Sequence, residues 1–462
     1  MKRFVVFFLL WTCFSLQASS TEIDSIYHQK FGKIVVYHPV GTPNSLAMFV
    51  SGDGGWRHGV LNMAKHIANQ GALVLGIDAK HYSDYLSKVK NNCLYPAADF
   101  EELSIAVQKK YNLPIYHKPV LIGYSYGAVL VYGLLAQAPA HTFKGAIALG
   151  FCPDIELKKP LCKGNGLTQR VLKPGKSYFL EPIKNLAEPF IVLNGVNDKT
   201  CPFDATELYL KDMPMTELVK LPKVGHGFSI GDNWLPQFSA AYKKIINNAA
   251  QQAQAIKDNL PIILVYTPKK SNLPLVFMIS GDGGWTSFDQ SLAQALAERG
   301  VPVAGLDAQS YFWKAKTPER SAVEINRAIL AAQQKSGRQQ LILAGYSFGA
   351  SIVPFIANRL NVDLKTKLEA IVLLSPQDVA DFEIHITDML NIGPKKGNYD
   401  VVAEIKKIKE VKPLCIFGQE ESSEKKALFA KNGLRVINIP GSHRYNENYI
   451  GIANLIIQQA NK

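Results

Sequence analysis

The sequence predicts an α/β protein built as two tandem domains, each with a mostly parallel sheet flanked by helices. Three observations lead to this prediction: the chain length, an internal duplication, and apolar runs that alternate with helical stretches. The chain has 462 residues, of which 47% are hydrophobic and 19% are charged. That balance is typical of globular domains, and the length is sufficient for two domains with sizeable cores.

Three segments of the chain occur twice, in the same order and at a nearly constant offset. The pairs are Met48–Trp56 with Phe277–Trp285, Gly76–Tyr82 with Gly305–Tyr311, and Leu121–Ala128 with Leu343–Ala350. Such a long period indicates a duplicated domain and not a solenoid. Between the copies lies a polar stretch rich in Ala and Gln, residues 247–258, which we expect to be the end of a helix that runs into a linker. We therefore expect a first domain over residues 21–250 and a second over 256–462.

The first 20 residues have the pattern of a signal peptide. Met1-Lys2-Arg3 precedes an apolar run, Phe4–Phe14, and the small residues Ala18-Ser19-Ser20 follow it. The run is shorter than the ~20 residues that a membrane-spanning helix needs. We therefore expect a signal peptide over residues 1–20, a periplasmic protein, and no transmembrane segment in the mature chain.

Apolar runs predict six strands in each copy. In the first copy these are Ser45–Val50, Ala72–Ile77, Val120–Gly123, Gly145–Phe151, Phe190–Leu193 and Leu218–Leu221. In the second copy they are Leu275–Ile279, Val301–Leu306, Leu341–Ala344, Ala370–Leu374, Leu414–Phe417 and Arg435–Ile439. Because apolar strands that alternate with helices are buried on both faces, the pattern predicts mostly parallel sheets.

Each copy has a Gly-x-Ser-x-Gly motif between an apolar strand and a helix-like run. The motifs are Gly123–Gly127, around Ser125, and Gly345–Gly349, around Ser347. This context is that of the nucleophile elbow of α/β-hydrolases, in which the serine occupies a strained turn. The glycines on either side avoid clashes in that turn. Ser125 and Ser347 are therefore candidate nucleophiles.

A serine nucleophile needs a histidine base and an acid, which follow in the order Ser, acid, His in this fold. In the first copy, Asp198 and His226 lie in segments that follow predicted strands. In the second copy, His443 is the candidate base. Glu421 is its candidate acid, and the adjacent Glu420 is the alternative.

The repeated Ser-Gly-Asp-Gly-Gly-Trp segment follows the first predicted strand, where this fold places its oxyanion loop. The candidate backbone donors are Gly54, Gly55 and Tyr126 in the first copy, and Gly283, Gly284 and Phe348 in the second. Asp53 and Asp282 are anionic, so we expect them to brace the turn or to meet a cationic group of the substrate. For Trp56 and Trp285 we expect a role as lid or packing residues.

Five cysteines follow the leader, and an exported protein can keep disulfides. We expect the pairs Cys152–Cys162 and Cys93–Cys201, with Cys415 as a buried free thiol. No spacing indicates a metal site, and no cofactor is expected. The formal net charge of +13 favours an anionic partner. Since the chain has no nucleic-acid-binding motif, the favoured partner is an anionic membrane face, with an incidental basic surface as the alternative.

The set of motifs resembles that of the bacterial virulence protein family VirJ, and the exported two-domain layout resembles its AcvB-like members. The resemblance rests on the oxyanion-loop and elbow motifs together with Ser375-Pro376, Asp381–His385 and the late His443. It covers the second copy end to end and the first copy more loosely. It implies a periplasmic α/β-hydrolase that removes lysine from lysyl-phosphatidylglycerol and is linked to virulence and type IV secretion. It also implies that Ser347 is the nucleophile and His443 the base.

Together with this resemblance, the motifs predict a serine ester hydrolase that acts on an aminoacylated phospholipid or another lipid at the periplasmic membrane face. A lysyl cation would need a carboxylate near the nucleophile, and the candidates are Asp282, Asp381 and Glu383. Two alternatives stay open. One is a binding or chaperone role with secretion-system proteins, and the other is a general esterase or peptidase.

Overall fold

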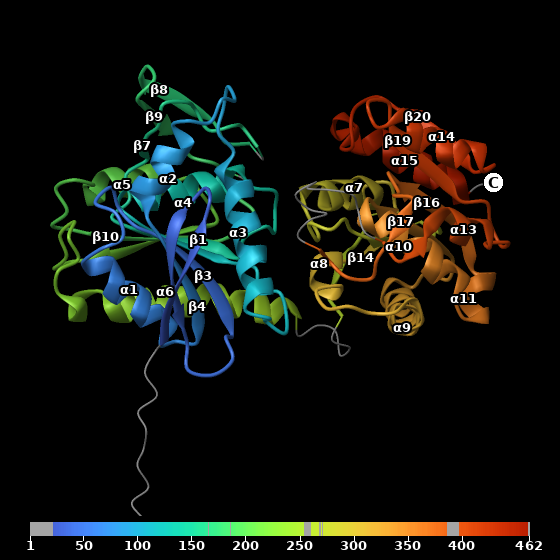
Figure 1. The fold of residues 1–462 in the computed structure, drawn as a ribbon, viewed down its shortest axis with the longest axis horizontal. Helices are drawn as coiled ribbons and strands as arrows, with labels where there is room; N and C mark the ends of the chain where they lie inside the picture. Colours follow the sequence, from blue (N-terminus) through green and yellow to red (C-terminus); the bar gives the residue numbers. More distant parts are fainter. Residues whose placement is uncertain are drawn as a thin grey trace, which may run out of the picture.

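The computed structural model describes residues 22–164, 166–184, 186–253, 260–267, 269, 271–385 and 397–460. The predicted signal peptide over residues 1–20 lies outside them. The described chain forms two large sheets, each with helices on both faces (Figure 1). The predicted fold class, α/β with two sheet-bearing regions, is therefore confirmed.

The first sheet has eight strands in the order β1-β2-β4-β3-β5-β6-β10-β11. Its strands are β1 (Glu22–His28), β2 (Gly32–His38), β3 (Ser45–Val50), β4 (Ala72–Ile77), β5 (Val120–Tyr124), β6 (Gly145–Leu149), β10 (Phe190–Gly195) and β11 (Thr216–Leu221). The pairs β1–β2 and β2–β4 are antiparallel, and the other pairs are parallel. Strands β3 and β4 are buried along their whole length, as their apolar sequences predict.

Helices cover both faces of this sheet. They are α1 (Gly59–Ala68), α2 (Ala79–Leu86), α3 (Pro96–Lys110), α4 (Tyr126–Gln137), α5 (Phe203–Leu210) and α6 (Leu235–Ala253), with a short 3-10 turn, η1 (Gly231–Asn233). Apolar residues of α1 and α6 pack in the core on one face, and those of α2, α3, α4 and α5 pack in the core on the other.

The second sheet has seven strands in the order β12-β14-β13-β15-β16-β19-β20. They are β12 (Ile262–Val265), β13 (Leu275–Ile279), β14 (Val303–Leu306), β15 (Leu341–Tyr346), β16 (Leu368–Leu374), β19 (Leu414–Gly418) and β20 (Arg435–Ile439). Only β12 runs antiparallel to its neighbour among these strands. The sheet repeats the strand order of the first domain without an equivalent of β1.

The second domain also has helices on both faces of its sheet. These are α7 (Ser287–Ala297), α8 (Ala308–Tyr311), α9 (Pro318–Ser336), α10 (Phe348–Asn358), α11 (Val362–Thr366), α13 (Val401–Lys406), α14 (Ser423–Lys431) and α15 (Tyr449–Ala460), with the 3-10 turn η2 (Tyr445–Glu447). Helices α7 and α15 pack on one face, and α8, α9, α10 and α13 pack on the other. None of the described helices is both long enough and apolar enough to cross a bilayer.

Each domain has an insertion between two neighbouring strands of its sheet. In the first domain, a three-stranded antiparallel sheet of β7 (Asp154–Glu156), β9 (Ser177–Leu180) and β8 (Gln169–Lys173) lies between β6 and β10 in the sequence. In the second domain, the short pair β17 (Val379–Ala380) and β18 (Tyr399–Asp400) lies between β16 and β19.

The disulfide prediction was wrong. The bridges are Cys93–Cys162 and Cys152–Cys201, with Cα–Cα distances of 4.9 and 5.2 Å. Strands β6 and β10 are parallel neighbours, so the segments that follow them, which contain Cys152 and Cys201, meet at one edge of the sheet. The cysteines of this bridge therefore pair because they follow adjacent strands, and not because they are close in sequence. Cys415 is a buried free thiol, as predicted.

The two domains contact each other through Trp313. Its indole Nε1 donates a hydrogen bond to the carbonyl oxygen of Leu113 at 3.0 Å, and its ring packs against Tyr116. Lys109 Nζ lies 4.5 Å from the Trp313 ring centroid and 3.1 Å from Glu383 Oε1. An aromatic anchor and a salt bridge therefore join the segment around α3 to the second domain.

Candidate active sites

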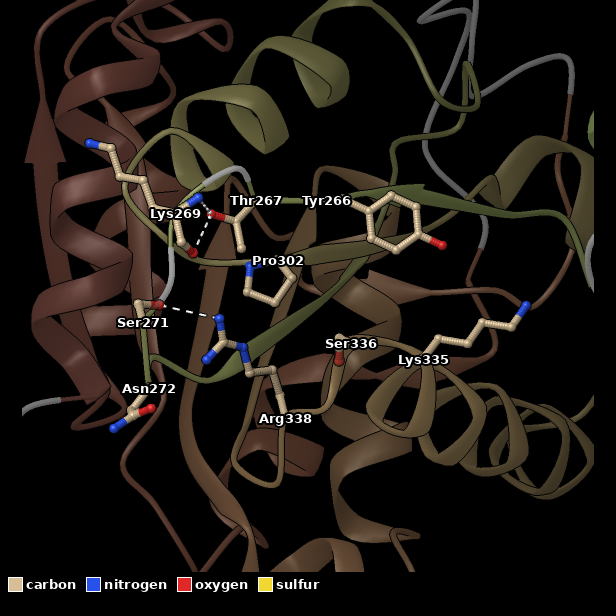
Figure 2. Close-up of a pocket in the computed structure, with 9 residues that line it drawn as sticks. All are labelled: Tyr266, Thr267, Lys269, Ser271, Asn272, Pro302, Lys335, Ser336 and Arg338. Atoms are coloured by element: carbon tan, nitrogen blue, oxygen red, sulfur yellow. Dashed lines mark hydrogen bonds between the residues drawn. The ribbon is translucent and has the colours of Figure 1, made fainter.

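A cavity of about 510 Å³ in the second domain lies away from the predicted nucleophile (Figure 2). Its lining includes Pro302 and Arg338, which precede strands β14 and β15, whereas Ser347 follows the end of β15. The side chains of Lys269 and Lys335 point away from each other in Figure 2, so the cations do not converge. Open α/β sheets bind ligands at the carboxyl ends of their strands, so the candidate sites lie at the opposite edge.

Both serines occupy a sharp turn between a strand and a helix. Ser125 joins β5 to α4 with φ 54°, and Ser347 joins β15 to α10 with φ 53°. A Cβ on Gly127 would lie 2.3 Å from the carbonyl oxygen of Val50. Only glycine fits there, as the elbow requires.

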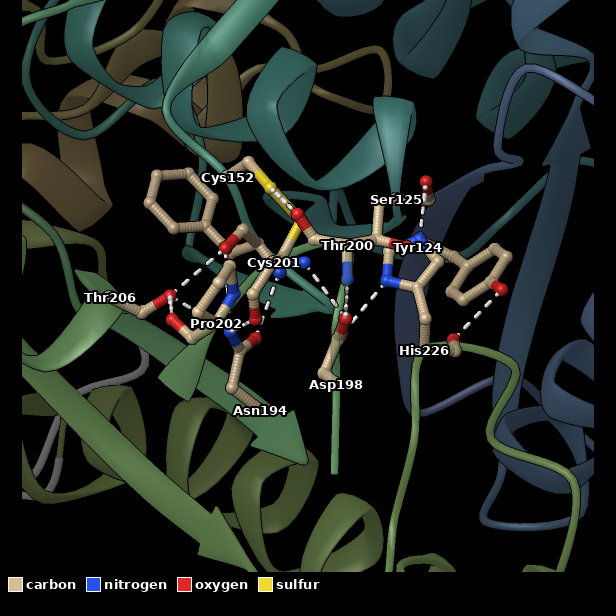
Figure 3. A network of polar contacts seen from close by, with 11 residues as sticks. Tyr124, Ser125, Cys152, Asn194, Asp198, Thr200, Cys201, Pro202, Thr206 and His226 are labelled. Carbon is tan, nitrogen blue, oxygen red and sulfur yellow. Dashed lines mark hydrogen bonds and ion pairs between the residues drawn. A yellow bond between two sulfur atoms is a disulfide. The ribbon is translucent and has the colours of Figure 1, made fainter. Parts of the chain in front are cut away.

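In the first domain the three predicted residues form a continuous hydrogen-bonded chain (Figure 3). His226 Nε2 lies 3.0 Å from Ser125 Oγ, and His226 Nδ1 lies 2.8 Å from Asp198 Oδ2. Asp198 is only 4% exposed, and its Oδ1 accepts hydrogen bonds from the amides of Thr200 and Cys201. With Nδ1 donating to the carboxylate, Nε2 is free to accept the proton of the serine.

The Cys152–Cys201 disulfide lies beside the hydrogen-bonded residues Ser125, His226 and Asp198 (Figure 3). The amide of Cys201 donates to Asp198 Oδ1 at 2.8 Å, and its carbonyl oxygen accepts a hydrogen bond from the buried Asn194 side chain. Asn194 Oδ1 also accepts a hydrogen bond from the amide of Phe151, next to Cys152. The segment that holds the acid is therefore tied both covalently and by hydrogen bonds to the segment after β6.

In the second domain the structure brings the acid and the histidine together. His443 Nδ1 lies 2.6 Å from Glu421 Oε1, whereas Glu420 is exposed and has no side-chain contact with His443. Burial alone would raise the pKa of Glu421. Hydrogen bonds from His443, Ser375 and the Gly418 amide instead hold that pKa below its usual value.

Ser347 differs from Ser125 in its contact with the histidine. Ser347 is 8% exposed, and among the described residues no hydrogen bond joins its hydroxyl to His443. In serine hydrolases the hydrogen bond between nucleophile and base is often long without substrate, so Ser347 stays a candidate nucleophile. The first site is the more fully assembled of the two.

Ser375 and Tyr445 are site residues to which the sequence analysis assigned no role. Ser375 Oγ donates to Glu421 Oε2 at 2.7 Å and lies 2.5 Å from Tyr445 Oη. Ser375 has φ 53°, and the first domain has Gly150, with φ 65°, at the corresponding position after β6. The Ser375-Pro376 pair was visible in the sequence, but nothing in its spacing linked it to the acid.

The oxyanion loops differ from expectation in which glycine faces the serine. A Cβ on Gly52 would lie 3.4 Å from Ser125 Cβ, and one on Gly281 would lie 3.7 Å from Ser347 Cβ. The amide of Gly55 donates to the carbonyl oxygen of Gly52 at 3.0 Å. The second domain has the same turn, in which the amide of Gly284 donates to the carbonyl oxygen of Gly281. The amide of Gly283 donates to Asp282 Oδ1 at 3.1 Å.

These contacts revise the list of donors. The amides of Gly55, Gly283 and Gly284 are engaged within the turn, so they do not serve as free donors in this state. Gly54 has open space around it. Tyr126 and Phe348 each begin a helix, where the first amides have no partner within the helix, and they stay the predicted donors.

The brace of the first loop is Asp78, not the expected Asp53. Asp78 Oδ2 accepts a hydrogen bond from the amide of Trp56 at 3.0 Å, whereas Asp53 is exposed. Trp56 packs so closely on Gly76 that a Cβ there would lie 2.1 Å from the indole ring. Trp56 and the buried Trp285 are therefore packing residues. Asp78 lies in the repeated Gly76–Tyr82 segment, so the duplication was the signal that marked it.

Two of the three acids proposed to bind a cation already have partners. Asp381 Oδ2 lies 2.8 Å from His385 Nε2, and Glu383 pairs with Lys109 of the first domain. Asp282 lies within electrostatic reach of Glu101 on α3. Burial raises the pKa of Glu101 to about 7, with Asp282 adding to the rise. Asp282 thus stays the candidate among the three.

The strand order, the two elbows and the Ser–His–acid sets define a protein with the α/β-hydrolase fold. The family profile described as bacterial virulence protein (VirJ) matches residues 44–149 and 274–462, which together make up more than half of the chain. The chain belongs to the VirJ family. A search of curated proteins finds no significant match.

Among the described residues, no group of three or more His, Cys, Asp or Glu could hold a metal ion.

Solved structures with a similar arrangement come from several bacteria. Est1E from Butyrivibrio proteoclasticus is 15% identical, with 45% of this chain and 98% of that chain covered and a TM-score of 0.34. An alpha-beta serine hydrolase homologue from Coxiella burnetii is 14% identical, with 50% and 98% covered and a TM-score of 0.31. A serine hydrolase without lid from Xanthomonas campestris is 14% identical, with 50% and 95% covered and a TM-score of 0.32.

Proposed function

We propose that the protein is a serine ester hydrolase and that Ser125, His226 and Asp198 form its poised centre. The observation that carries the proposal is the continuous hydrogen-bonded chain from Ser125 Oγ through both ring nitrogens of His226 to the buried Asp198. A binding protein has no need of a serine, a histidine and an acid in this geometry. Ser347, His443 and Glu421 form a second proposed centre, in which the serine must turn toward the histidine when substrate binds.

In the proposed reaction, Ser125 Oγ attacks the ester carbonyl carbon while His226 Nε2 takes the serine proton. The carbonyl electrons move to the oxygen, where the amide of Tyr126 and an amide of the loop around Gly52 would stabilise the charge. Collapse of the intermediate breaks the bond to the leaving alcohol, and the protonated His226 gives its proton to that oxygen. Water then attacks the acyl-serine, with His226 again as base, and releases the acid and the free serine.

The proposed substrate is an aminoacylated phospholipid such as lysyl-phosphatidylglycerol at the periplasmic face of the membrane, with a role in virulence and envelope lipid homeostasis. Support comes from membership in the VirJ family and from the resemblance to its AcvB-like members. Asp282 would meet the lysyl cation at the second site. Hydrolysis would release lysine and phosphatidylglycerol.

The test is covalent labelling of the mature protein by a fluorophosphonate, followed by mass spectrometry of the two elbow peptides. We expect labelling of Ser125 in the wild-type protein and its loss in Ser125→Ala and His226→Ala. Ser347→Ala is the matched control for the first site. If neither serine is labelled, the enzyme proposal fails and a binding role with secretion-system proteins takes its place.

The substrate is tested separately with vesicles that contain lysyl-phosphatidylglycerol. We expect release of free lysine by the wild-type protein and none by the Ser125→Ala/Ser347→Ala double variant. Cleavage of short p-nitrophenyl esters without lysine release would instead identify a general esterase. In cells that make the lipid, deletion of the gene should raise its level.

A further inference from the structure

The three-stranded insertion of the first domain lies at the edge of the sheet that carries Ser125. It leaves the large sheet from the carboxyl end of β6, the strand next to β5, and projects from the body of the domain (Figure 1). It rests on α4, the helix that begins immediately after Ser125. Tyr126 Oη donates to the carbonyl oxygen of Glu156 at 3.4 Å, and Tyr132 Oη donates to that of Glu181 at 2.7 Å.

The outer strand of this insertion exposes apolar side chains. β8 is the edge strand in the order β7-β9-β8, so its outer side has no strand partner among the described residues. Val171 and Leu172, adjacent on β8, are 56% and 41% exposed. Exposed apolar residues on an unpaired edge strand are a liability that proteins usually avoid, so their presence indicates a partner.

The β8–β9 hairpin and the segment that leads to it carry an excess of positive charge. Residues 157–176 include six cationic side chains, Lys158, Lys159, Lys163, Arg170, Lys173 and Lys176, and no Asp or Glu. Two of these cations already have partners: Lys159 donates a hydrogen bond to the carbonyl oxygen of Val89, and Arg170 pairs with Glu181. Lys158, Lys163, Lys173 and Lys176 are exposed to solvent. Lys173 and Lys176 flank the turn of the β8–β9 hairpin, directly beside the apolar pair.

The insertion is held in place before any partner binds. The Cys93–Cys162 disulfide ties its base to the segment before α3. The guanidinium of Arg170 lies 4.0 Å from the Phe179 ring centroid, which joins β8 to β9. A preorganised surface loses little conformational entropy on docking.

We propose that the β8–β9 hairpin docks the protein on an anionic phospholipid bilayer. Val171 and Leu172 enter the interfacial region, and Lys173 and Lys176 pair with lipid phosphates. Cations beside a small apolar wedge are the combination that binds anionic membrane surfaces. Docking through this hairpin holds the edge of the sheet that carries Ser125 close to the lipid headgroups. The proposal does not depend on hydrolysis, since binding is measured without turnover.

The test is sedimentation of the mature protein with vesicles of phosphatidylcholine alone or with one third phosphatidylglycerol. We expect binding only to the anionic vesicles, weakening as salt is added. Each lysine near an anionic surface contributes about fivefold to binding. Lys173→Glu/Lys176→Glu should therefore bind roughly 30-fold more weakly or worse. Val171→Ser/Leu172→Ser should also weaken binding, without changing its salt dependence.

The matched control is Lys412→Glu/Lys431→Glu, which changes the charge equally at exposed lysines of the second domain. It should bind as the wild-type protein does, and an unchanged circular dichroism spectrum and melting temperature in every variant show that each has folded. Equal loss of binding in the control and hairpin variants would reduce the effect to net charge and overturn the proposal. So would a dimer without lipid that Val171→Ser/Leu172→Ser dissociates, because the hairpin would then pair with a second copy.

Discussion

Lys118 of the first domain lies with its Nζ 3.4 Å from Oδ2 of Asp307, a carboxylate of the second domain that is only 3% exposed. Asp307 supports the second oxyanion loop, since a Cβ on Gly284 would lie 2.7 Å from its Oδ1. In the first domain the corresponding Asp78 uses Oδ2 to hold the amide of Trp56. The contact between domains thus engages the oxygen of Asp307 that does not face its loop, whereas in Asp78 the loop-facing oxygen holds Trp56.

Replacing Lys118 with Met should therefore slow the second site and spare the first. The buried Asp307 would lose its only cationic partner among the described residues, and the loop it supports would shift. We expect labelling of Ser347 to slow by roughly tenfold. Both peptides are followed in one sample, so Ser125 is the internal reference.

Lys109→Met is the control, because it breaks the pair with Glu383 across the same interface without touching Asp307. Equal slowing of Ser347 in both variants would show that docking as a whole matters, and not the contact with Asp307.

Ser375→Gly should shift the pH dependence of the second site. The variant removes one of the hydrogen bonds that lower the pKa of Glu421, so that pKa should rise. Glu421 would then be protonated at a higher pH, and labelling of Ser347 would fall at a higher pH on the acid side. Glycine tolerates the positive φ, as Gly150 does in the first domain, so no strain is introduced. An unmoved acid limb would contradict this positioning role.

The two disulfides should differ in their effect on Ser125. Removal of either bridge by Cys→Ser changes should cost up to about 4 kcal/mol of unfolding free energy, because each closes a long loop. Only the Cys152→Ser/Cys201→Ser pair adjoins Asp198, so only it should also slow labelling of Ser125. Denaturant unfolding and labelling rates separate the two effects. Equal slowing by Cys93→Ser/Cys162→Ser would contradict the assignment.

Gly127→Ala should disrupt the first elbow. Its Cβ would lie 2.3 Å from the carbonyl oxygen of Val50, a contact with rigid backbone. We expect a loss of ~3 kcal/mol in the free energy of unfolding, measured by urea denaturation, and loss of Ser125 labelling. Gly54→Ala is the matched control, since nothing lies within 4 Å of its added methyl group. A Gly127→Ala protein as stable as the control would argue against the tight turn.

Glu101→Gln should stabilise the protein progressively as pH rises. Burial, with Asp282 adding to it, raises the pKa of Glu101 to about 7 in the folded chain, above the usual 4.5. The folded state of the wild-type protein therefore binds this proton more tightly than the unfolded state does. Proton binding stabilises the fold below pH 4.5, and that contribution is lost as pH rises through 7. Glutamine cannot ionise. The melting temperature of the variant should therefore exceed that of the wild type by an amount that grows from pH 5 to pH 8. A difference that stays constant over this pH range would contradict the prediction.

Much of the fold followed from the apolar pattern. The runs Ser45–Val50, Ala72–Ile77, Leu275–Ile279 and Arg435–Ile439 are strands with the same bounds as predicted. Strands β1, β2 and β12 escaped prediction because they lie at or near sheet edges, where antiparallel pairing and partial exposure weaken the apolar signal.

The sequence by itself determined the duplication, the parallel cores and the two elbows, because these depend on burial and on local backbone geometry. Only the tertiary structure decided which cysteines pair, which carboxylate Lys118 contacts, and that Glu421 rather than Glu420 meets His443. These contacts join residues that parallel crossovers or domain docking bring together from distant parts of the chain. Sequence separation carries no information about such neighbours, so their identity is settled only when the sheet is assembled.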